Sequence, residues 1–167
     1  MKTNECPDKR PIPQIHNRCF GLELDQKEVL TLFDLIDQHP DIKIPPGEIS
    51  FNFVNEEEIC RLHDQFFQDP EPTDVITFPG DLEDQVSGDI CISPEYAISM
   101  ARDFGHTFSR ELSLYLIHGC LHLSGFRDHE VAERAEMRKG EQTLMNAVES
   151  ANLFPTFTYT KNSIIYA

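Results

Sequence analysis

The run ELSLYLIHGCLHLSGFRDH, residues 111–129, contains the clearest structural signal in the chain. From Glu111 to Leu123 apolar side chains cover most of the circumference of a helix, a pattern typical of a helix packed in the middle of a domain. Gly125 then ends the helix and lets the chain turn back. We therefore predict that the other elements of the fold pack around this segment.

The flanking sequence predicts a sheet and further helices. Ile49, Phe51 and Phe53 alternate with polar residues, as in a strand with one buried face. DVITF (74–78) and DICIS (89–93) are short β-rich runs whose linker is too short for a crossover helix, which predicts an antiparallel pair. Apolar residues at helical spacing predict helices that start near Asp25, Asn55, Ser93 and Ser109 and span 130–149. We predict an α+β fold: a small mixed β-sheet of about four strands packed with about five helices, the central one carrying histidines.

The length of 167 residues predicts one domain. Residues 1–14 contain three prolines and no periodic apolar pattern, so we expect a flexible N-terminal arm there and a single domain over 15–167. The pattern of residues 151–167 predicts no particular position in the fold.

Composition indicates a soluble protein in a reducing compartment. No apolar run approaches the roughly 20 residues that cross a bilayer, and the N-terminus lacks the pattern of a secretory signal. The five cysteines form no CxxC pair, which favours reduced thiols over a disulfide framework. We expect a cytoplasmic protein without a membrane partner.

The charge distribution restricts where a polyanion could bind. A formal net charge of −15 opposes nucleic-acid binding over most of the surface, and we expect no DNA partner. Residues 102–139, however, contain six Lys or Arg and six Asp or Glu, so this segment is neutral. A bound dication would make it locally positive.

Three histidines in the central segment predict a metal site. His118 and His122 lie four residues apart on one helix face, a spacing suited to chelating one ion, and His129 follows the helix-ending glycine as a third ligand. Glu111, seven residues before His118, falls on the same face and could orient an imidazole. A solvated or hydrogen-bonded histidine pair is the ordinary alternative, but the clustering within an apolar helix favours metal.

Three ligands with an open fourth position favour a catalytic zinc ion, one per chain, which would lower the pKa of its water to about 7. Nickel is an alternative because affinity order alone favours several metals. The zinc-peptidase pattern needs a glutamate after the first histidine, where this chain has Gly119. With several arginines nearby, a phosphodiester is the more natural substrate bond.

The blocks HGCLHLSGFRDH (118–129), PTDVITF (72–78) and SGDICIS (87–93) together resemble the YbeY family of bacterial rRNA-maturation endoribonucleases, in the family's order and over roughly residues 50–148. The resemblance implies a zinc-dependent endoribonuclease of the bacterial cytoplasm that prefers single strands. It also implies action in 16S rRNA 3′-end maturation and ribosome quality control, with small-subunit rRNA and ribosomal or ribosome-associated proteins as partners.

Two departures from the family pattern affect the predicted site. The loop before His129 is one residue longer than in the family, so Asp128 rivals His129 as a ligand or acts as general base. Phe67 stands where the family usually has an arginine. We hypothesise that Arg127 supplies that charge in catalysis, a solvated loop residue being an equal alternative.

Further charged residues have two interpretations each. Arg134 and Arg138 share one side of the last predicted helix and could bind substrate phosphates, or form a solvated face paired with acids. Asp74 and Asp89 could contact substrate, but capping of turns is the interpretation we favour.

For the whole chain, the alternative to the nuclease is a ribosome-assembly or rRNA-binding factor with little intrinsic activity. A third and weaker interpretation is a zinc hydrolase that acts on some other substrate.

Overall fold

A mixed four-stranded sheet forms the centre of the molecule. The structure is a computed structural model that describes residues 10–167. The strands lie in the order β1-β3-β5-β4, where β1, β3 and β5 are parallel and β4 is antiparallel to β5. Their bounds are β1 (Pro11–Asn17), β3 (Gly47–Phe53), β5 (Val86–Ile92) and β4 (Val75–Pro79). The predicted mixed sheet and its antiparallel pair are confirmed.

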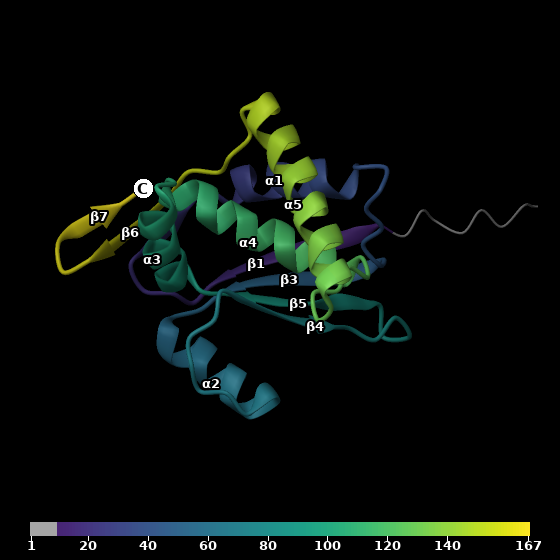
Figure 1. Ribbon diagram of the computed structural model, residues 1–167, viewed down its shortest axis with the longest axis horizontal. Coiled ribbons are helices and arrows are strands. Elements are labelled where there is room, and N and C mark those ends of the chain that lie inside the picture. The colour runs from purple at the N-terminus through teal and green to yellow at the C-terminus, as the bar shows by residue number, and fades with distance from the viewer. Residues whose placement is uncertain (1–9) are drawn as a thin grey trace, which may run out of the picture.

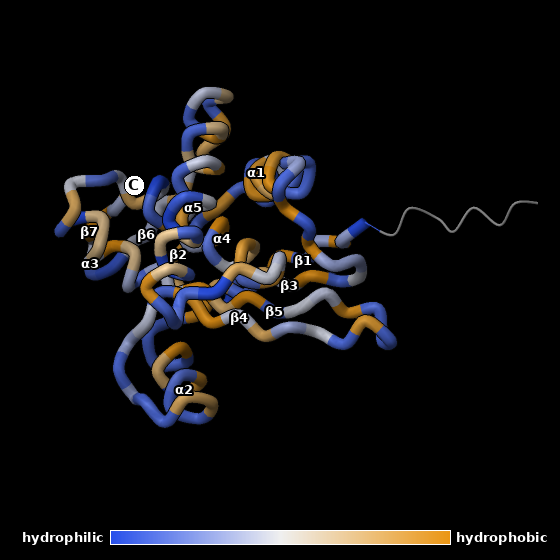
Figure 2. Tube along the Cα trace, turned by 45° about the vertical axis from the view of Figure 1, so that its right-hand side comes forward, coloured by the Kyte–Doolittle hydropathy of each residue, from blue (hydrophilic) through white to orange (hydrophobic). Residues whose placement is uncertain are grey.

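Helices cover both faces of this sheet (Figure 1). α1, α4 and α5 lie on one face and α2 lies on the other, while α3 stands at the end where the parallel strands finish (Figure 1). Their bounds are α1 (Gln26–Asp37), α2 (Glu56–Phe67), α3 (Pro94–Phe104), α4 (Phe108–Leu123) and α5 (Val131–Ala151). Hydrophobic residues concentrate where α1 and α4 meet β1, β3 and β5 (Figure 2). Within the described residues the α+β fold with five helices is confirmed.

The predicted helix starts correspond to real N-caps. Asp25, Asn55 and Ser93 each accept a hydrogen bond from a backbone N–H in the first turn of α1, α2 and α3. Thr107 does the same for α4, which therefore begins slightly earlier than predicted. Pro94 occupies the first turn of α3, where its missing N–H costs nothing.

The expected arm over residues 1–14 is wrong at its C-terminal end. Residues 1–9 lie outside the described part of the chain, but Pro11 to Gln14 belong to β1, which pairs in parallel with β3. Proline cannot donate to a sheet ladder and is tolerated on edge strands, and β1 is an edge of this sheet. The prolines that suggested a loose segment are therefore compatible with a strand at this position.

The C-terminal segment forms a second sheet, which the sequence did not predict. β2 (Leu22–Leu24) pairs with β6 (Phe157–Lys161), which pairs with β7 (Ile164–Tyr166), all antiparallel. Phe157 is fully buried, and its N–H donates to Ser109 Oγ at the start of α4 (2.9 Å). The tail is thus fastened to the central helix.

α4 is buried between the sheet and α5. Leu112, Ile117 and Cys120 are fully buried, as the apolar pattern predicted. A Cβ atom on Gly119 would lie 2.5 Å from Cγ2 of Ile90 on β5, so glycine is what lets α4 approach the sheet this closely. Although α4 is largely apolar, no helix of the described chain has both the length and the apolar character to cross a membrane.

We expect Gly119→Ala to destabilise the fold by about 1–3 kcal/mol, because the added methyl overpacks the contact with Ile90. Urea unfolding followed by circular dichroism measures the loss. In an Ile90→Ala background, where the clashing atoms are absent, the same substitution should cost clearly less. An equal cost in both backgrounds would contradict the explanation that the contact with Ile90 requires a glycine at position 119.

Candidate metal centre

His118 and His122 form the centre of a polar site on the last turns of α4. Their Nε2 atoms lie 2.9 Å apart, and both side chains are largely buried, with exposures of 16% and 26%. The four-residue spacing brings the imidazoles together by helix geometry alone. The structure therefore brings this predicted pair together.

The other nitrogen of each ring is held by an oxygen. His118 Nδ1 lies 2.6 Å from Glu141 Oε1 on α5, and His122 Nδ1 lies 3.1 Å from the Phe126 carbonyl oxygen. A carbonyl accepts only, so His122 Nδ1 carries the proton, and the carboxylate favours the same tautomer of His118. Both Nε2 lone pairs then point at one another, an arrangement that a shared cation or proton would stabilise.

Asp128 completes the cluster. Its Oδ2 lies 3.5 Å from His122 Nε2 and 3.8 Å from His118 Nε2. The three side chains form a group whose ligand atoms all lie within 4.8 Å of one another. Two bonds of about 2.0–2.2 Å to a common ion can span the separations of 2.9, 3.5 and 3.8 Å, so the group could hold a metal ion with imidazole and carboxylate ligands.

Two contacts fix the loop that carries Asp128. Arg134 on α5 donates through Nη1 to the carbonyl oxygens of His129 (2.6 Å) and Asp128 (3.3 Å). The Glu133 carboxylate accepts the backbone N–H of Glu130 (3.0 Å). The loop is thus bonded to the first turn of the helix that follows it.

The pKa values of the two histidines shift in opposite directions. Burial opposes the charging of His118, but the Glu141 hydrogen bond and the charges of Asp74, Glu141 and Asp128 outweigh it, so the pKa of His118 is raised. Burial and then the neighbouring His118 lower the pKa of His122. The unprotonated His122 needed for metal binding is therefore favoured.

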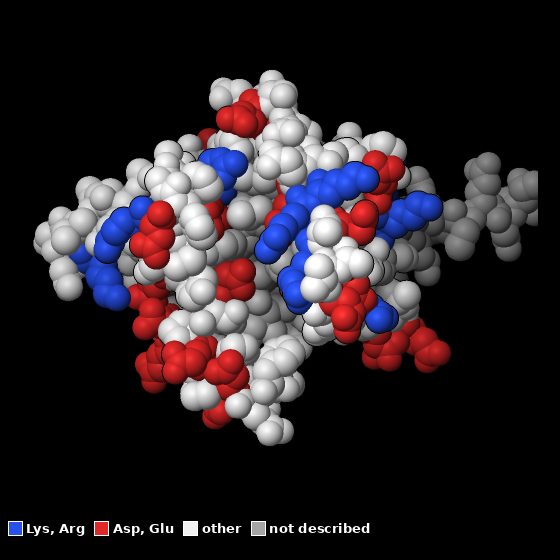
Figure 3. Space-filling view, in the orientation of Figure 1, with Lys and Arg blue, Asp and Glu red and all other residues white. Residues whose placement is uncertain are grey.

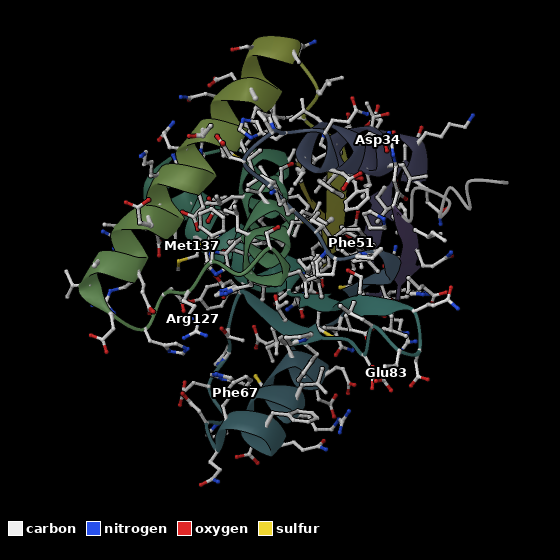
Figure 4. All side chains as sticks on the ribbon, turned by 90° about the vertical axis from the view of Figure 1, so that its right-hand side faces the viewer. Asp34, Phe51, Phe67, Glu83, Arg127 and Met137 are labelled. Carbon is white, nitrogen blue, oxygen red and sulfur yellow. The ribbon has the colours of Figure 1, made fainter. Side chains whose placement is uncertain are left out.

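The cluster opens into a cavity of about 430 Å³ at the β4 edge of the sheet. His118, His122, Asp128 and His129 line one side of it, the residues of β4 its floor, and His63 and Phe67 of α2 another side. Figure 4 shows Phe67 at the end of α2 and Arg127 on the loop before α5.

The remaining predicted residues are placed as follows. His129 lines the cavity but is not in the ligand group, in which Asp128 takes the third position. Arg127 is exposed and lines a neighbouring cavity with Phe126 and Glu133. Arg138 is exposed on α5. Asp74 lines the main cavity, and its Oδ1 accepts the Val75 N–H (2.7 Å), which agrees with the capping interpretation. Asp89 instead lies within β5, paired with Ser50 and Phe78, so its expected capping role is wrong.

The prediction that Glu111 orients a metal-binding imidazole is wrong. Glu111 is buried, but its Oε2 lies 3.3 Å from His106 Nδ1, and the Nδ1 atoms of His118 and His122 are held by other groups. Position on the same helix face did not suffice, because two turns separate Glu111 from His118. Glu141 lies 23 residues from His118 and has no local sequence signal, so it was missed.

Charged side chains are distributed differently over α2 and α5. Figure 3 shows Lys and Arg interspersed with acidic side chains over the first half of α5 and acidic side chains over the N-terminal part of α2, with an uncharged surface at the other end of α2. The acidic group includes Glu56, Glu57 and Glu58, and the basic group includes Arg134, Arg138 and Lys139. Basic residues therefore lie on the side of the opening that carries Asp128.

Fold and site together define an α+β protein with a candidate metal centre on its central helix. The family model described as Endoribonuclease YbeY matches residues 14–149. The chain is 35% identical over 124 residues to Endoribonuclease YbeY of Carboxydothermus hydrogenoformans, covering 71% of this chain and 87% of the relative. It is 37% identical over 123 residues to Endoribonuclease YbeY of Acholeplasma laidlawii, and the match covers 72% of this chain and 89% of the relative.

A comparison with solved structures gives a consistent result. The solution structure of a Thermotoga maritima protein matches with a TM-score of 0.55 and 30% identity, covering 85% of this chain and 95% of that one. The chain belongs to the Endoribonuclease YbeY family. Membership confirms the resemblance found in the sequence and places the chain among the nuclease hydrolases.

We expect Glu141→Gln to lower the pKa of His118 in metal-free protein, because the neutral amide no longer stabilises the imidazolium. The raised pKa stabilises the wild type at low pH, and this part is lost as the pH rises through it. As the pH falls from about 8 to about 6, the range around the ordinary histidine pKa, the wild type should therefore become more stable relative to the variant. Histidine NMR titration and urea unfolding measure both effects, with exposed Glu149→Gln on the same helix as control. An unchanged pKa of His118 would refute the interaction.

Proposed function

We propose that the chain is a zinc-dependent endoribonuclease that cuts single-stranded RNA at the α4 site, with one zinc ion held by His118, His122 and Asp128. The observation that carries this proposal is the convergence of two imidazole Nε2 atoms and a carboxylate oxygen in the lining of a cavity. Family membership supplies the reaction class.

The donor set suits zinc. Nitrogen and carboxylate ligands are common at catalytic zinc sites, which keep three protein ligands and an open position. The Glu141 contact is the kind of outer hydrogen bond that fixes the tautomer of a liganding histidine. Zinc bound there would supply a Lewis acid and activate a water molecule.

Protein groups around the site have separate tasks in this proposal. Glu141 and the Phe126 carbonyl orient the two imidazoles, and Arg134 holds the loop that presents Asp128. The exposed cations Arg127 and Arg138 would attract the substrate phosphates to that side of the opening. Asp128, for which the sequence also allows a general-base role, is assigned to metal binding, and His129 remains beside it on the cavity wall.

As biological substrate we propose small-subunit rRNA, in 16S rRNA 3′-end maturation and ribosome quality control in the bacterial cytoplasm. This part rests on the family resemblance. The net charge of −15 favours a second candidate, a ribosome-assembly factor that docks through protein partners and cleaves little. Loss of rRNA processing in metal-ligand variants that still bind ribosomes would support the enzyme, whereas retained processing would support the binding factor.

We expect Asp128→Asn to lose both metal and RNA cleavage, whereas His129→Ala keeps close to one zinc per chain. The reason is that Asp128, and not His129, stands within ligand distance of both imidazoles. Metal content by mass spectrometry and cleavage of a labelled single strand are measured on the same samples. The reverse pattern would restore His129 as the third ligand, and a metal-free wild type would refute the zinc site.

We expect Arg134→Ala to weaken zinc binding about tenfold, because the Asp128 loop loses two hydrogen bonds to α5. Arg138→Ala should leave zinc affinity unchanged and lower the slope of RNA affinity against salt by about 1, as expected of a phosphate contact. Zinc competition and RNA binding at several salt concentrations separate the two roles. An Arg134 variant with normal zinc affinity and a reduced salt slope would instead make Arg134 a phosphate contact.

A further inference from the structure

The wall of the metal cavity contributed by α2 is aromatic. His63 and Phe67 lie one turn apart on the last turns of α2, with their ring centroids 5.6 Å apart, and both line the cavity that contains His118, His122 and Asp128. Phe67 is 58% exposed. A phenylalanine exposed to this extent beside a polar site leaves apolar area in water that a ligand could cover.

Its neighbour Phe66 provides a comparison within the same turn. Phe66 is exposed to a similar extent, 53%, but its ring packs against Phe78 of β4 at a centroid distance of 4.8 Å, and it does not line the cavity. Phe67 has the histidine as its ring partner and faces the site. The two adjacent phenylalanines thus differ in surroundings and not in general exposure.

The aromatic wall is held in place. His63 Nδ1 lies 2.8 Å from the Glu71 carbonyl oxygen, so this nitrogen carries the proton and donates to it. The bond ties α2 to the segment that leads into β4 and fixes the plane of the imidazole beside Phe67. A fixed ring loses little conformational freedom when a planar ligand stacks on it.

The side chains of this wall are better suited to binding a nucleobase than a phosphate group. Within the described chain, none of the residues that line this cavity is a lysine or arginine. Arg61, the cation of α2, is engaged by Glu58 and Gln65. Phosphates are therefore attracted to the α5 side, and the α2 side offers a flat apolar surface, which is the type of surface that binds unpaired bases by stacking.

We propose that His63 and Phe67 form a stacking site for one unpaired base of the RNA strand whose cleaved linkage lies at the metal centre. This inference rests on the proposed nuclease function and deepens it. A base can reach this wall only if it is free of its partner strand, because a paired base is stacked inside its helix. The aromatic wall therefore accounts for selection of single strands at this site.

The chain contains no tryptophan, so Phe67→Trp places a single fluorescent reporter in the wall, and Phe66→Trp provides the matched control. Each metal-loaded variant is titrated with a hexa-adenylate that resists cleavage because its linkages are phosphorothioates. Binding is followed independently by the anisotropy of a dye on the oligonucleotide. A hexamer of abasic residues and a duplex of the same length serve as control ligands.

We expect hexa-adenylate to quench the indole fluorescence of the Phe67→Trp variant saturably, at the concentrations where anisotropy rises. Either control ligand should change this fluorescence little, and so should hexa-adenylate added to the Phe66→Trp variant. Phe67→Ala should bind hexa-adenylate about 5- to 100-fold more weakly than wild type while keeping its metal.

Two outcomes would count against the proposal in different ways. Binding by anisotropy without quenching in the Phe67→Trp variant, or equal quenching in both tryptophan variants, would overturn the stacking site and leave the nuclease proposal intact. No binding together with no cleavage of RNA by wild type would overturn both.

Discussion

The close approach of α4 to β5 at Gly119 is the constraint on which the rest of the structure depends. With no side chain there, the helix axis lies near enough to the sheet that Ile90 fills the space a Cβ would occupy. The adjacent His118 is carried to the edge of the sheet by the same contact, and His122 follows one turn later. α5 then packs on the other side of α4, where a Cβ on Gly140 would lie 3.2 Å from Leu121 and Phe126 side chains. The candidate ligands His118 and His122 are therefore placed by backbone packing and not by a flexible loop.

Local patterns in the sequence predicted the parts of this arrangement that local geometry determines. The imidazoles of His118 and His122 meet because residues four apart share a helix face, and β4 and β5 are antiparallel because their linker is too short for a parallel crossover. N-caps such as Asn55 and Ser93 were visible for the same reason, since a side chain bonds within three residues of itself. These features needed no knowledge of tertiary structure.

Features that depend on distant partners were not predictable in this way. β1 is a strand only because β3 offers it an edge, and the tail is ordered by β2 and by Ser109, which lies 48 residues from Phe157 in sequence. The choice between Asp128 and His129 depends on how the loop is held by Arg134, a backbone contact that leaves no periodic signal. Glu141 was missed for the same reason, and Glu111 was preferred because it lies seven residues before His118 on the same helix face.

A metal ion bound at this candidate site would be coupled to the fold through α5. This helix supplies Glu141, which orients His118, and Arg134, which anchors the Asp128 loop, while Met137 and Leu144 of the same helix are buried in the common core. An ion that binds the folded site and not the unfolded chain stabilises the folded state by mass action. Because its ligands lie on α4 and on the loop, and their supports on α5, that stabilisation would act on the α4–α5 contact. The aromatic wall, by contrast, belongs to α2 on the opposite face of the sheet, so the proposed base-stacking surface and the supports of the candidate metal site are carried by separate parts of the fold. Loss of one need not disturb the other.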